Sequence, residues 1–128
     1  VTTHGNPHCH IILRGGSEGP NYDSGSVAAA IARLEESGVS KAIMVDASHA
    51  NSNKDHRLQP EVFENVIDQR VKGNGWIVAG MLESNLEAGA QSLSGPLETL
   101  TYGKSITDKC IDWETTERVV KAAYEKLS

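Results

Sequence analysis

Four short strand-like segments recur along the chain, and each is followed at once by a residue that can take part in chemistry. In chain order, residues 8–13 precede Arg14, residues 42–47 precede Ser48 and His49, residues 77–82 precede Glu83, and residues 102–107 precede Asp108. Parallel strands bring their carboxyl ends to one edge of a sheet, which is where ligands bind in α/β proteins. If the four segments pair in parallel, these side chains share one face.

Helical segments separate the strand-like ones. Residues 26–38 carry one apolar stripe, Pro60 suits the first turn of a second helix, and Asp112 is a predicted N-cap for the last helix. Strands that alternate with helices imply parallel pairing through right-handed crossovers. The pattern predicts an α/β protein with four parallel strands. Four such units match half of a (β/α)8 barrel as well as a small open sheet.

Composition narrows the function classes. The net charge is −5 and no basic run is present, which argues against a nucleic-acid partner. No apolar stretch is long enough to cross a membrane. The two cysteines lie far apart in the sequence, as expected of a reduced, cytoplasmic protein. Because the first residue is Val1, we expect the chain to begin within a longer protein.

One histidine and two carboxylates, His49, Glu83 and Asp108, form the strongest candidate site. Nitrogen and oxygen ligands of this kind suit a divalent ion such as Mn²⁺, Fe²⁺, Co²⁺ or Zn²⁺. For each residue alone, a capping histidine or a solvated carboxylate is the commoner role. Their shared position at the ends of strands favours the metal site.

A second candidate is Arg14, which two glycines follow. A guanidinium at a strand end suits the bidentate capture of a phosphate or a carboxylate. From its position alone, a structural salt bridge explains this arginine equally well.

Weaker candidates have no supporting pattern. A metal site at the N-terminal histidines lacks a zinc-type spacing, a Schiff-base lysine lacks a desolvating neighbourhood, and the cysteines lack a base beside them. These residues are His4, His8, His10, Lys104, Cys9 and Cys110.

Several strings, in this order and spacing, resemble the C-terminal part of type I 3-deoxy-D-arabino-heptulosonate 7-phosphate (DAHP) synthases, and the stretch Ser52-Asn53-Lys54-Asp55 is most similar to the fungal branch. The strings are Ile12-Leu13-Arg14-Gly15-Gly16, Ser48-His49-Ala50-Asn51-Ser52-Asn53-Lys54, Gly80-Met81-Leu82-Glu83-Ser84-Asn85-Leu86 and Tyr102-Gly103-Lys104-Ser105-Ile106-Thr107-Asp108. The resemblance covers essentially the whole chain.

The resemblance implies a metal-dependent (β/α)8 barrel that condenses phosphoenolpyruvate with erythrose 4-phosphate and releases phosphate, the first step of the shikimate pathway to aromatic amino acids. It assigns His49, Glu83 and Asp108 as metal ligands, Arg14 as a contact of the phosphoenolpyruvate phosphate, and His49 and Arg14 as catalytic and substrate-binding residues. The fourth ligand of the family is a cysteine in a Gly-Pro-Cys-Ser context, which neither cysteine here matches. A Lys-Pro-Arg region of the family is also absent.

We therefore expect residues 1–128 to be the C-terminal half-barrel of such a synthase, inactive by itself. A half-barrel exposes two edge strands and an apolar lining, so we expect it to form a homo-oligomer or to pair with the missing N-terminal half. Two alternatives are a non-catalytic binding or assembly module and a metal-dependent hydrolase, although no spare carboxylate at a strand end offers a hydrolytic base.

Overall fold

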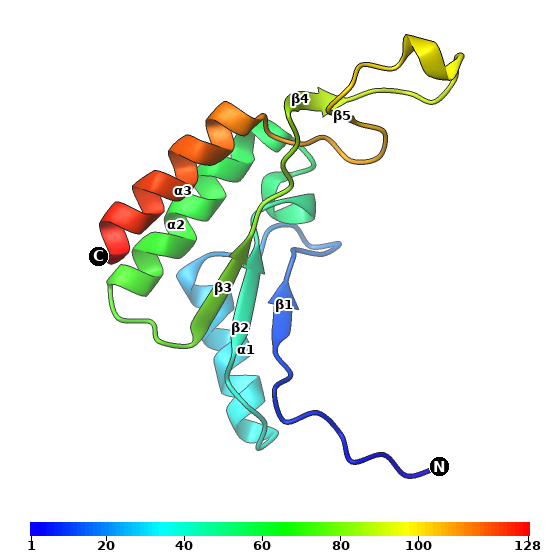
Figure 1. Cartoon of the computed structure of the whole chain (residues 1–128). Helices are drawn as coiled ribbons and strands as arrows, with labels where there is room; N and C mark the ends of the chain where they lie inside the picture. The colour runs from blue at the N-terminus through cyan, green and yellow to red at the C-terminus, as the bar shows by residue number, and fades with distance from the viewer.

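A computed structural model of residues 1–128 shows an α/β arrangement around three parallel strands (Figure 1). The strands are β1 (Ile11–Leu13), β2 (Ile43–Asp46) and β3 (Ile77–Met81), in the order β1-β2-β3. Ile11 lies beside Ile43, and Ile43 lies beside Ile77, so the same side of the sheet is apolar on all three strands. The prediction of parallel strands that alternate with helices is confirmed for this part of the chain.

Helices follow the strands much as the sequence predicts. They are α1 (Ser24–Glu36), α2 (Gln59–Val71) and α3 (Trp113–Leu127). Asp23 caps α1 by accepting hydrogen bonds from the backbone N–H groups of Gly25 and Ser26, and Pro60 lies in the first turn of α2. Asp112 caps α3 through a 2.8 Å hydrogen bond from the N–H of Thr115, as predicted. None of these helices combines the length and the apolar character that crossing a membrane requires.

The core lies between one face of the sheet and the helices α1 and α2. Its five buried members are Val27, Ile43, Val45, Val66 and Ile77. Burying each such side chain contributes about 1.5–3 kcal/mol to folding. Helix α3 packs along α2 on the outside, so that these two helices lie side by side in Figure 1.

The opposite face of the sheet has no helix over it. Side chains alternate along a strand, so the neighbours of the core residues point to this second face. Ile12 is 51% exposed and Val78 is 59% exposed, although both belong to central parts of their strands. The sheet is therefore covered on one side and bare on the other.

The predicted fourth strand departs from this pattern. Only Lys104–Ser105 of residues 102–107 form a strand, β5, and it pairs in parallel with β4 (Glu87–Ala90) in a separate sheet. No α-helix separates β3 from β5; a projecting arm that contains β4, β5 and a short 3-10 helix, η3 (Leu97–Thr99), takes its place (Figure 1).

Ile111, which follows β5 in the chain, lies beside the residues that come after β3. The N–H of Ile111 donates to the carbonyl of Glu83, and the N–H of Asn85 donates to the carbonyl of Ile111, each at 3.0 Å. Four strands in one sheet were thus the wrong expectation. The segment 102–107 contains Gly103 at φ 78° and few apolar side chains, and it extends the arm rather than the sheet.

Candidate metal centre

The three residues singled out as metal ligands lie together at the carboxyl edge of the sheet. His49 begins η1 (His49–Ser52) directly beyond β2, Glu83 follows β3, and Asp108 comes from the loop after β5. One ligand atom from each side chain lies within 4.8 Å of the other two. The Nε2 atom of His49 is 3.6 Å from Oε1 of Glu83. The sequence prediction that these side chains share one face is therefore confirmed.

The donor set fits a divalent ion. Zinc, for example, binds nitrogen and oxygen ligands at about 2.0–2.2 Å, which places two ligands of one ion at most about 4.4 Å apart. A separation of up to 4.8 Å needs only a small side-chain movement to reach that range. A small cavity of about 40 Å³ borders the three side chains, and it has no apolar residue in its wall. Its wall is formed by Ser48, His49, Ser52, Lys54, His56, Glu83, Asp108 and Lys109.

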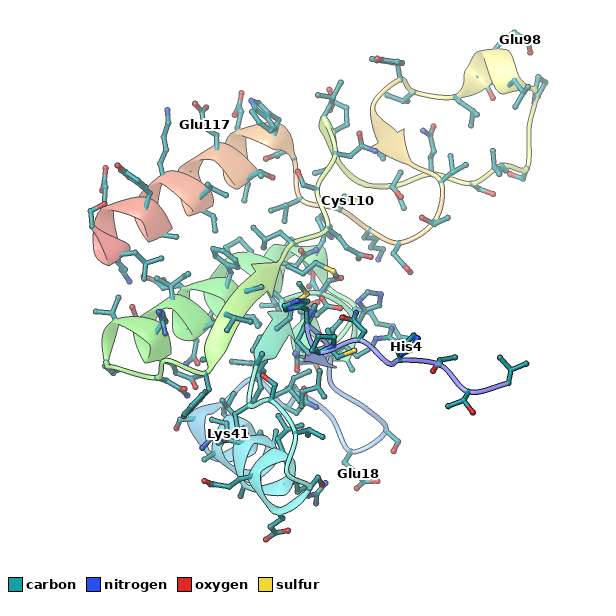
Figure 2. All side chains as sticks on the ribbon, turned by 60° about the horizontal axis from the view of Figure 1, so that its bottom comes forward. His4, Glu18, Lys41, Glu98, Cys110 and Glu117 are labelled. Atoms are coloured by element: carbon teal, nitrogen blue, oxygen red, sulfur yellow. The ribbon has the colours of Figure 1, made fainter.

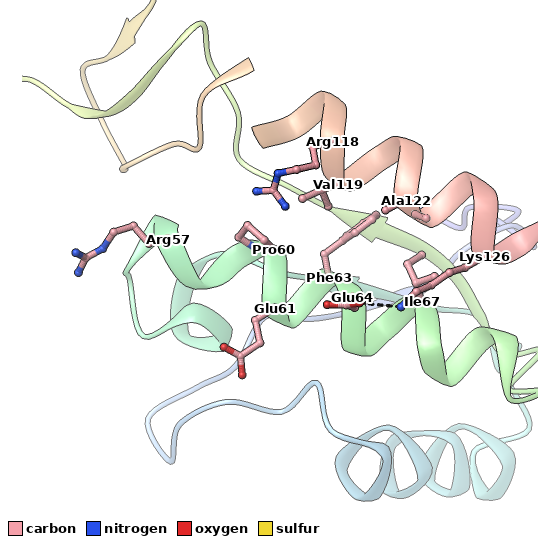
Figure 3. Close-up of a pocket in the computed structure, with 11 residues that line it drawn as sticks. Arg57, Pro60, Glu61, Phe63, Glu64, Ile67, Arg118, Val119, Ala122 and Lys126 are labelled. Carbon is pink, nitrogen blue, oxygen red and sulfur yellow. Dashed lines mark hydrogen bonds and ion pairs between the residues drawn. The ribbon is translucent and has the colours of Figure 1, made fainter. Parts of the chain in front are cut away.

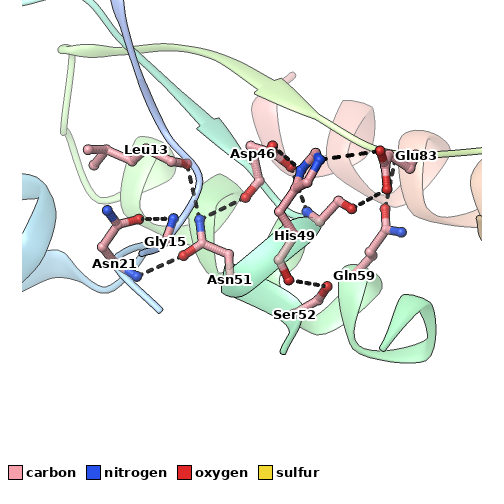
Figure 4. A network of polar contacts seen from close by, with 10 residues as sticks. Leu13, Gly15, Asn21, Asp46, His49, Asn51, Ser52, Gln59 and Glu83 are labelled. Atoms are coloured by element: carbon pink, nitrogen blue, oxygen red, sulfur yellow. Dashed lines mark hydrogen bonds and ion pairs between the residues drawn. The ribbon is translucent and has the colours of Figure 1, made fainter. Parts of the chain in front are cut away.

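A buried polar network surrounds His49 (Figure 4). Oδ2 of Asp46 is 2.6 Å from Nδ1 of His49, and Oδ1 of Asp46 accepts a 2.7 Å hydrogen bond from the N–H of Ser48. The hydroxyl of Ser48 donates in turn to the carboxylate of Glu83. Asp46 and Ser48 are only 3% and 4% exposed, so these contacts are shielded from water.

Gln59 holds the second candidate ligand from the other side. It is the first residue of α2 and is fully buried, and its Oε1 atom accepts a 2.8 Å hydrogen bond from the backbone N–H of Glu83. A fixed backbone at Glu83 limits where its carboxylate can lie. Helix α2 therefore contributes to the site although none of the predicted ligands belongs to it.

The loop that carries His49 has an unusual backbone. His49, Asn53 and Lys54 adopt φ angles of 51°, 52° and 59°, and they are the only non-glycine residues of the chain with positive φ. Such conformations cost of order 1–3 kcal/mol each and persist only where the surroundings impose them. Three of the six residues 49–54 therefore have a backbone that the surrounding structure must hold in place.

Arg14 lies at the same edge of the sheet, directly after β1, but it does not line the small cavity. Its side chain is exposed, and none of the salt bridges in the chain includes it. The structural salt bridge that the sequence left open does not form. The guanidinium is free to contact a ligand at this edge.

Two asparagines tie the end of β1 to the end of β2 (Figure 4). The side-chain amide of Asn51 donates to the carbonyls of Leu13, at 3.1 Å, and Asp46, at 2.7 Å. The N–H of Asn21 donates to Oδ1 of Asn51, and Oδ1 of Asn21 accepts from the N–H of Gly15, each at 2.7 Å. The backbone on both sides of Arg14 is thereby fixed relative to β2.

Sequence reasoning missed most of the side chains that hold the site in place. A carboxylate at the end of an otherwise apolar strand was the available signal for Asp46. Asn51 and Gln59 gave no local signal, because their partners Leu13 and Glu83 lie 38 and 24 residues away along the chain.

The weaker candidates lie elsewhere. His4, His8 and His10 are exposed on the N-terminal segment and belong to no cluster of potential metal ligands. Figure 2 shows His4 on this extended segment. Lys104 lies in the arm, outside the wall of the small cavity. Both cysteines are free thiols, and burial raises the pKa of the Cys110 thiol, which disfavours the nucleophilic thiolate.

A larger cavity of about 320 Å³ lies between α2 and α3, on the outside of the molecule (Figure 3). Phe63 and Ile67 form its apolar floor, and Arg118 reaches over it from α3. Lys126 closes one end through a 2.8 Å contact with Glu64. It contains neither histidine nor cysteine and is separate from the carboxyl edge of the sheet.

Parallel strands with a histidine and two carboxylates at their carboxyl edge define this chain as an α/β protein with a candidate metal centre. The family model of the DAHP synthetase I family matches residues 1–121. The chain therefore belongs to the DAHP synthetase I family, as the sequence motifs indicated.

Relatives from bacteria and fungi match at similar levels. The chain is 46% identical over 128 residues to the Tyr-sensitive phospho-2-dehydro-3-deoxyheptonate aldolase of Salmonella typhimurium, covering all of this chain and 36% of that protein. It is 47% identical to a putative phospho-2-dehydro-3-deoxyheptonate aldolase of Schizosaccharomyces pombe, covering 34% of it. The phenylalanine-inhibited enzyme of Saccharomyces cerevisiae is 43% identical over 98% of this chain and 35% of its own length.

A solved structure agrees with this assignment. The phospho-2-dehydro-3-deoxyheptonate aldolase from Francisella tularensis superposes with a TM-score of 0.91 at 40% sequence identity, covering 97% of this chain and 36% of that one. The chain thus spans about a third of the length of each of these four relatives.

Proposed function

We propose that residues 1–128 form the C-terminal half of a (β/α)8 barrel, and that the complete gene product condenses phosphoenolpyruvate with erythrose 4-phosphate to give DAHP and phosphate. This would be the first step of the shikimate pathway to aromatic amino acids. Family membership supports the reaction class. The observation that carries the proposal is the cluster of His49, Glu83 and Asp108 at the carboxyl edge of the sheet.

The bare face of the sheet supports the half-barrel. Ile12 and Val78 point away from the helices into solvent, and both β1 and β3 are edge strands. A closed barrel would cover this face and pair both edges. The other two thirds of the length of the relatives leave room for the strands that such closure needs. Pairing with those strands, or with a second copy in a homo-oligomer, stays a prediction.

His49, Glu83 and Asp108 would hold the divalent ion, which when bound supplies a positive charge that polarises the aldehyde oxygen of the sugar phosphate. The enol carbon of phosphoenolpyruvate could then attack the aldehyde carbon and form the new carbon–carbon bond, while the aldehyde oxygen takes up a proton. A water molecule would add to C2 of phosphoenolpyruvate, and breaking the C2–O bond would release phosphate and leave the ketone of DAHP. Mn²⁺, Fe²⁺, Co²⁺ and Zn²⁺ all accept nitrogen and oxygen ligands of this kind.

The protein groups bind and orient the substrates. Arg14, free of any protein carboxylate, would hold the phosphoenolpyruvate phosphate through charge-assisted hydrogen bonds. Two phosphorylated substrates need several cationic anchors, and at this edge the chain offers Arg14 together with Lys54 and Lys109 in the wall of the small cavity. Further anchors, and any further metal ligand, would come from the rest of the gene product.

The test is His49→Ala in the complete gene product, with bound metal and DAHP formation measured on the same sample. We expect both to be lost, because a ligand is removed from a site with few ligands. His10→Ala, an exposed histidine away from the cluster, is the matched control and should retain both. Normal metal content and turnover in His49→Ala would refute the assignment.

A further inference from the structure

We propose that Asp46 is a positioning residue that fixes the tautomer of His49, so that the Nε2 lone pair faces Glu83 and Asp108. This inference rests on the proposed function, because it takes His49 to bind the metal through Nε2. Asp46 itself is outside the ligand cluster, and each of its carboxylate oxygens makes a hydrogen bond within the protein.

The carboxylate of Asp46 is held firmly in place. Asp46 is the last residue of β2 and only 3% exposed. Its Oδ1 atom accepts a hydrogen bond from the N–H of Ser48, and its own backbone carbonyl accepts one from the amide of Asn51, each at 2.7 Å. The side chain and the backbone of Asp46 are therefore both fixed before any ligand binds.

Hydrogen-bond chemistry then decides which ring nitrogen of His49 carries the proton. A backbone N–H can only donate, so Oδ1 of Asp46 is an acceptor. Oδ2 of the same carboxylate lies 2.6 Å from Nδ1 of His49, and because an ionised carboxylate only accepts hydrogen bonds, Nδ1 is the donor. In the neutral ring the proton is then on Nδ1, and Nε2 keeps the lone pair that a metal ligand needs.

The direction of the ring agrees with this assignment. Nε2 of His49 points to Oε1 of Glu83, 3.6 Å away, on the side of the ring opposite Asp46 (Figure 4). Asp46 and Glu83 lie at the two opposite nitrogens of the ring. A free imidazole ring would sample both tautomers and several orientations.

Asp46→Asn provides a sharp test because the amide has nearly the shape of the carboxylate. Ser48 still requires an acceptor, so the amide oxygen would face Ser48 and the amide NH₂ would face Nδ1 of His49. An NH₂ group only donates, which forces Nδ1 to accept and moves the ring proton to Nε2. The substitution would thus remove the lone pair without removing bulk.

The measurement is the affinity of the metal-free complete gene product for Co²⁺. Binding is detected by the visible absorption of the bound ion. We expect Asp46→Asn to weaken binding by about 10–100-fold, the range found when such supporting groups are changed. Asp46→Ala should weaken the binding of Co²⁺ less than Asp46→Asn does. Alanine places no hydrogen-bond donor beside Nδ1, so the ring proton can stay on Nδ1.

This order separates a tautomer effect from a merely structural one. A structural role predicts the reverse order, because alanine deletes the acceptor of Ser48 and should lower the thermal midpoint of the metal-free protein more than asparagine does. Affinity for Co²⁺ that is unchanged in Asp46→Asn, or lower in Asp46→Ala than in Asp46→Asn, would overturn the inference. Failure of the wild-type protein to bind Co²⁺ would instead overturn the proposed function.

Discussion

Gly15 is the point at which the loop after β1 touches the loop that carries His49, and Gly15→Ala should separate them. Gly15 has a φ of +74°, in the region that disfavours side chains. A Cβ atom there would lie 2.7 Å from Cβ of Ala50, 2.9 Å from its carbonyl carbon and 2.9 Å from the backbone nitrogen of Asn51. Two of these three atoms belong to the backbone, so no side-chain rotation relieves the contact.

Two costs add to give the expected loss of stability. A left-handed conformation costs an alanine about 1–2 kcal/mol relative to glycine. Forcing an extra carbon into a packed contact costs about 1–3 kcal/mol. We therefore expect Gly15→Ala to lower the free energy of unfolding by about 2–5 kcal/mol. Because Ala50 follows His49 directly, the same shift should also weaken metal binding.

The assay is denaturant unfolding of the complete gene product, with Gly16→Ala as the matched control. A Cβ at Gly16 meets no atom within 4 Å, and its φ lies outside the left-handed range. Its effect should stay within about 0.5 kcal/mol, as for ordinary surface changes. Equal stability of the two alanine variants would refute the close contact between these loops.

Two further substitutions test other parts of the site and fold. Arg14→Ala should raise the KM for phosphoenolpyruvate about 10–100-fold, because it removes a charged hydrogen bond worth about 1.5–3 kcal/mol. The KM for the sugar phosphate should change much less. Equal effects on the two KM values would show that Arg14 is structural. Asp112→Ala should cost about 1 kcal/mol through the lost cap of α3. The side-chain and backbone hydrogen bonds of Thr115 hold the pKa of Asp112 below its ordinary value of 3.8, so the carboxylate stabilises the folded state above that pH. The difference in unfolding free energy between wild type and Asp112→Ala should therefore shrink as the pH falls below 3.8 through the lowered pKa, and a difference that persists in acid would contradict this account.

Local sequence patterns were sufficient to predict the strands of the main sheet and the helices that follow them. Ile43 and Val45 belong to a continuous apolar run, the pattern of a buried strand, and Pro60 and Asp112 lie at the beginnings of α2 and α3. The clustering of His49 with Glu83 followed from the parallel pairing of β2 with β3, because that pairing brings the two strand ends together.

Contacts between residues far apart in the sequence could not be predicted from local patterns. Strand β4 contains Gly89 and two alanines, which have low strand propensity, and it forms because the arm folds back on itself through β5. The exposed Ile12 and Val78 had the composition of buried strand residues, and the sequence alone could not show which face the helices cover. Asn51 and Gln59 act on partners far along the chain, which no local motif encodes.

The left-handed backbone at His49 sets stability and function against each other. Glycine would adopt a φ of 51° without strain, and asparagine would do so more readily than histidine. Relief of backbone strain alone would therefore favour replacing the residue that the proposed chemistry needs most. Engineering of this protein for heat resistance has to hold position 49 constant and seek its gains elsewhere, for instance in the solvent-exposed turns of α1 and α3.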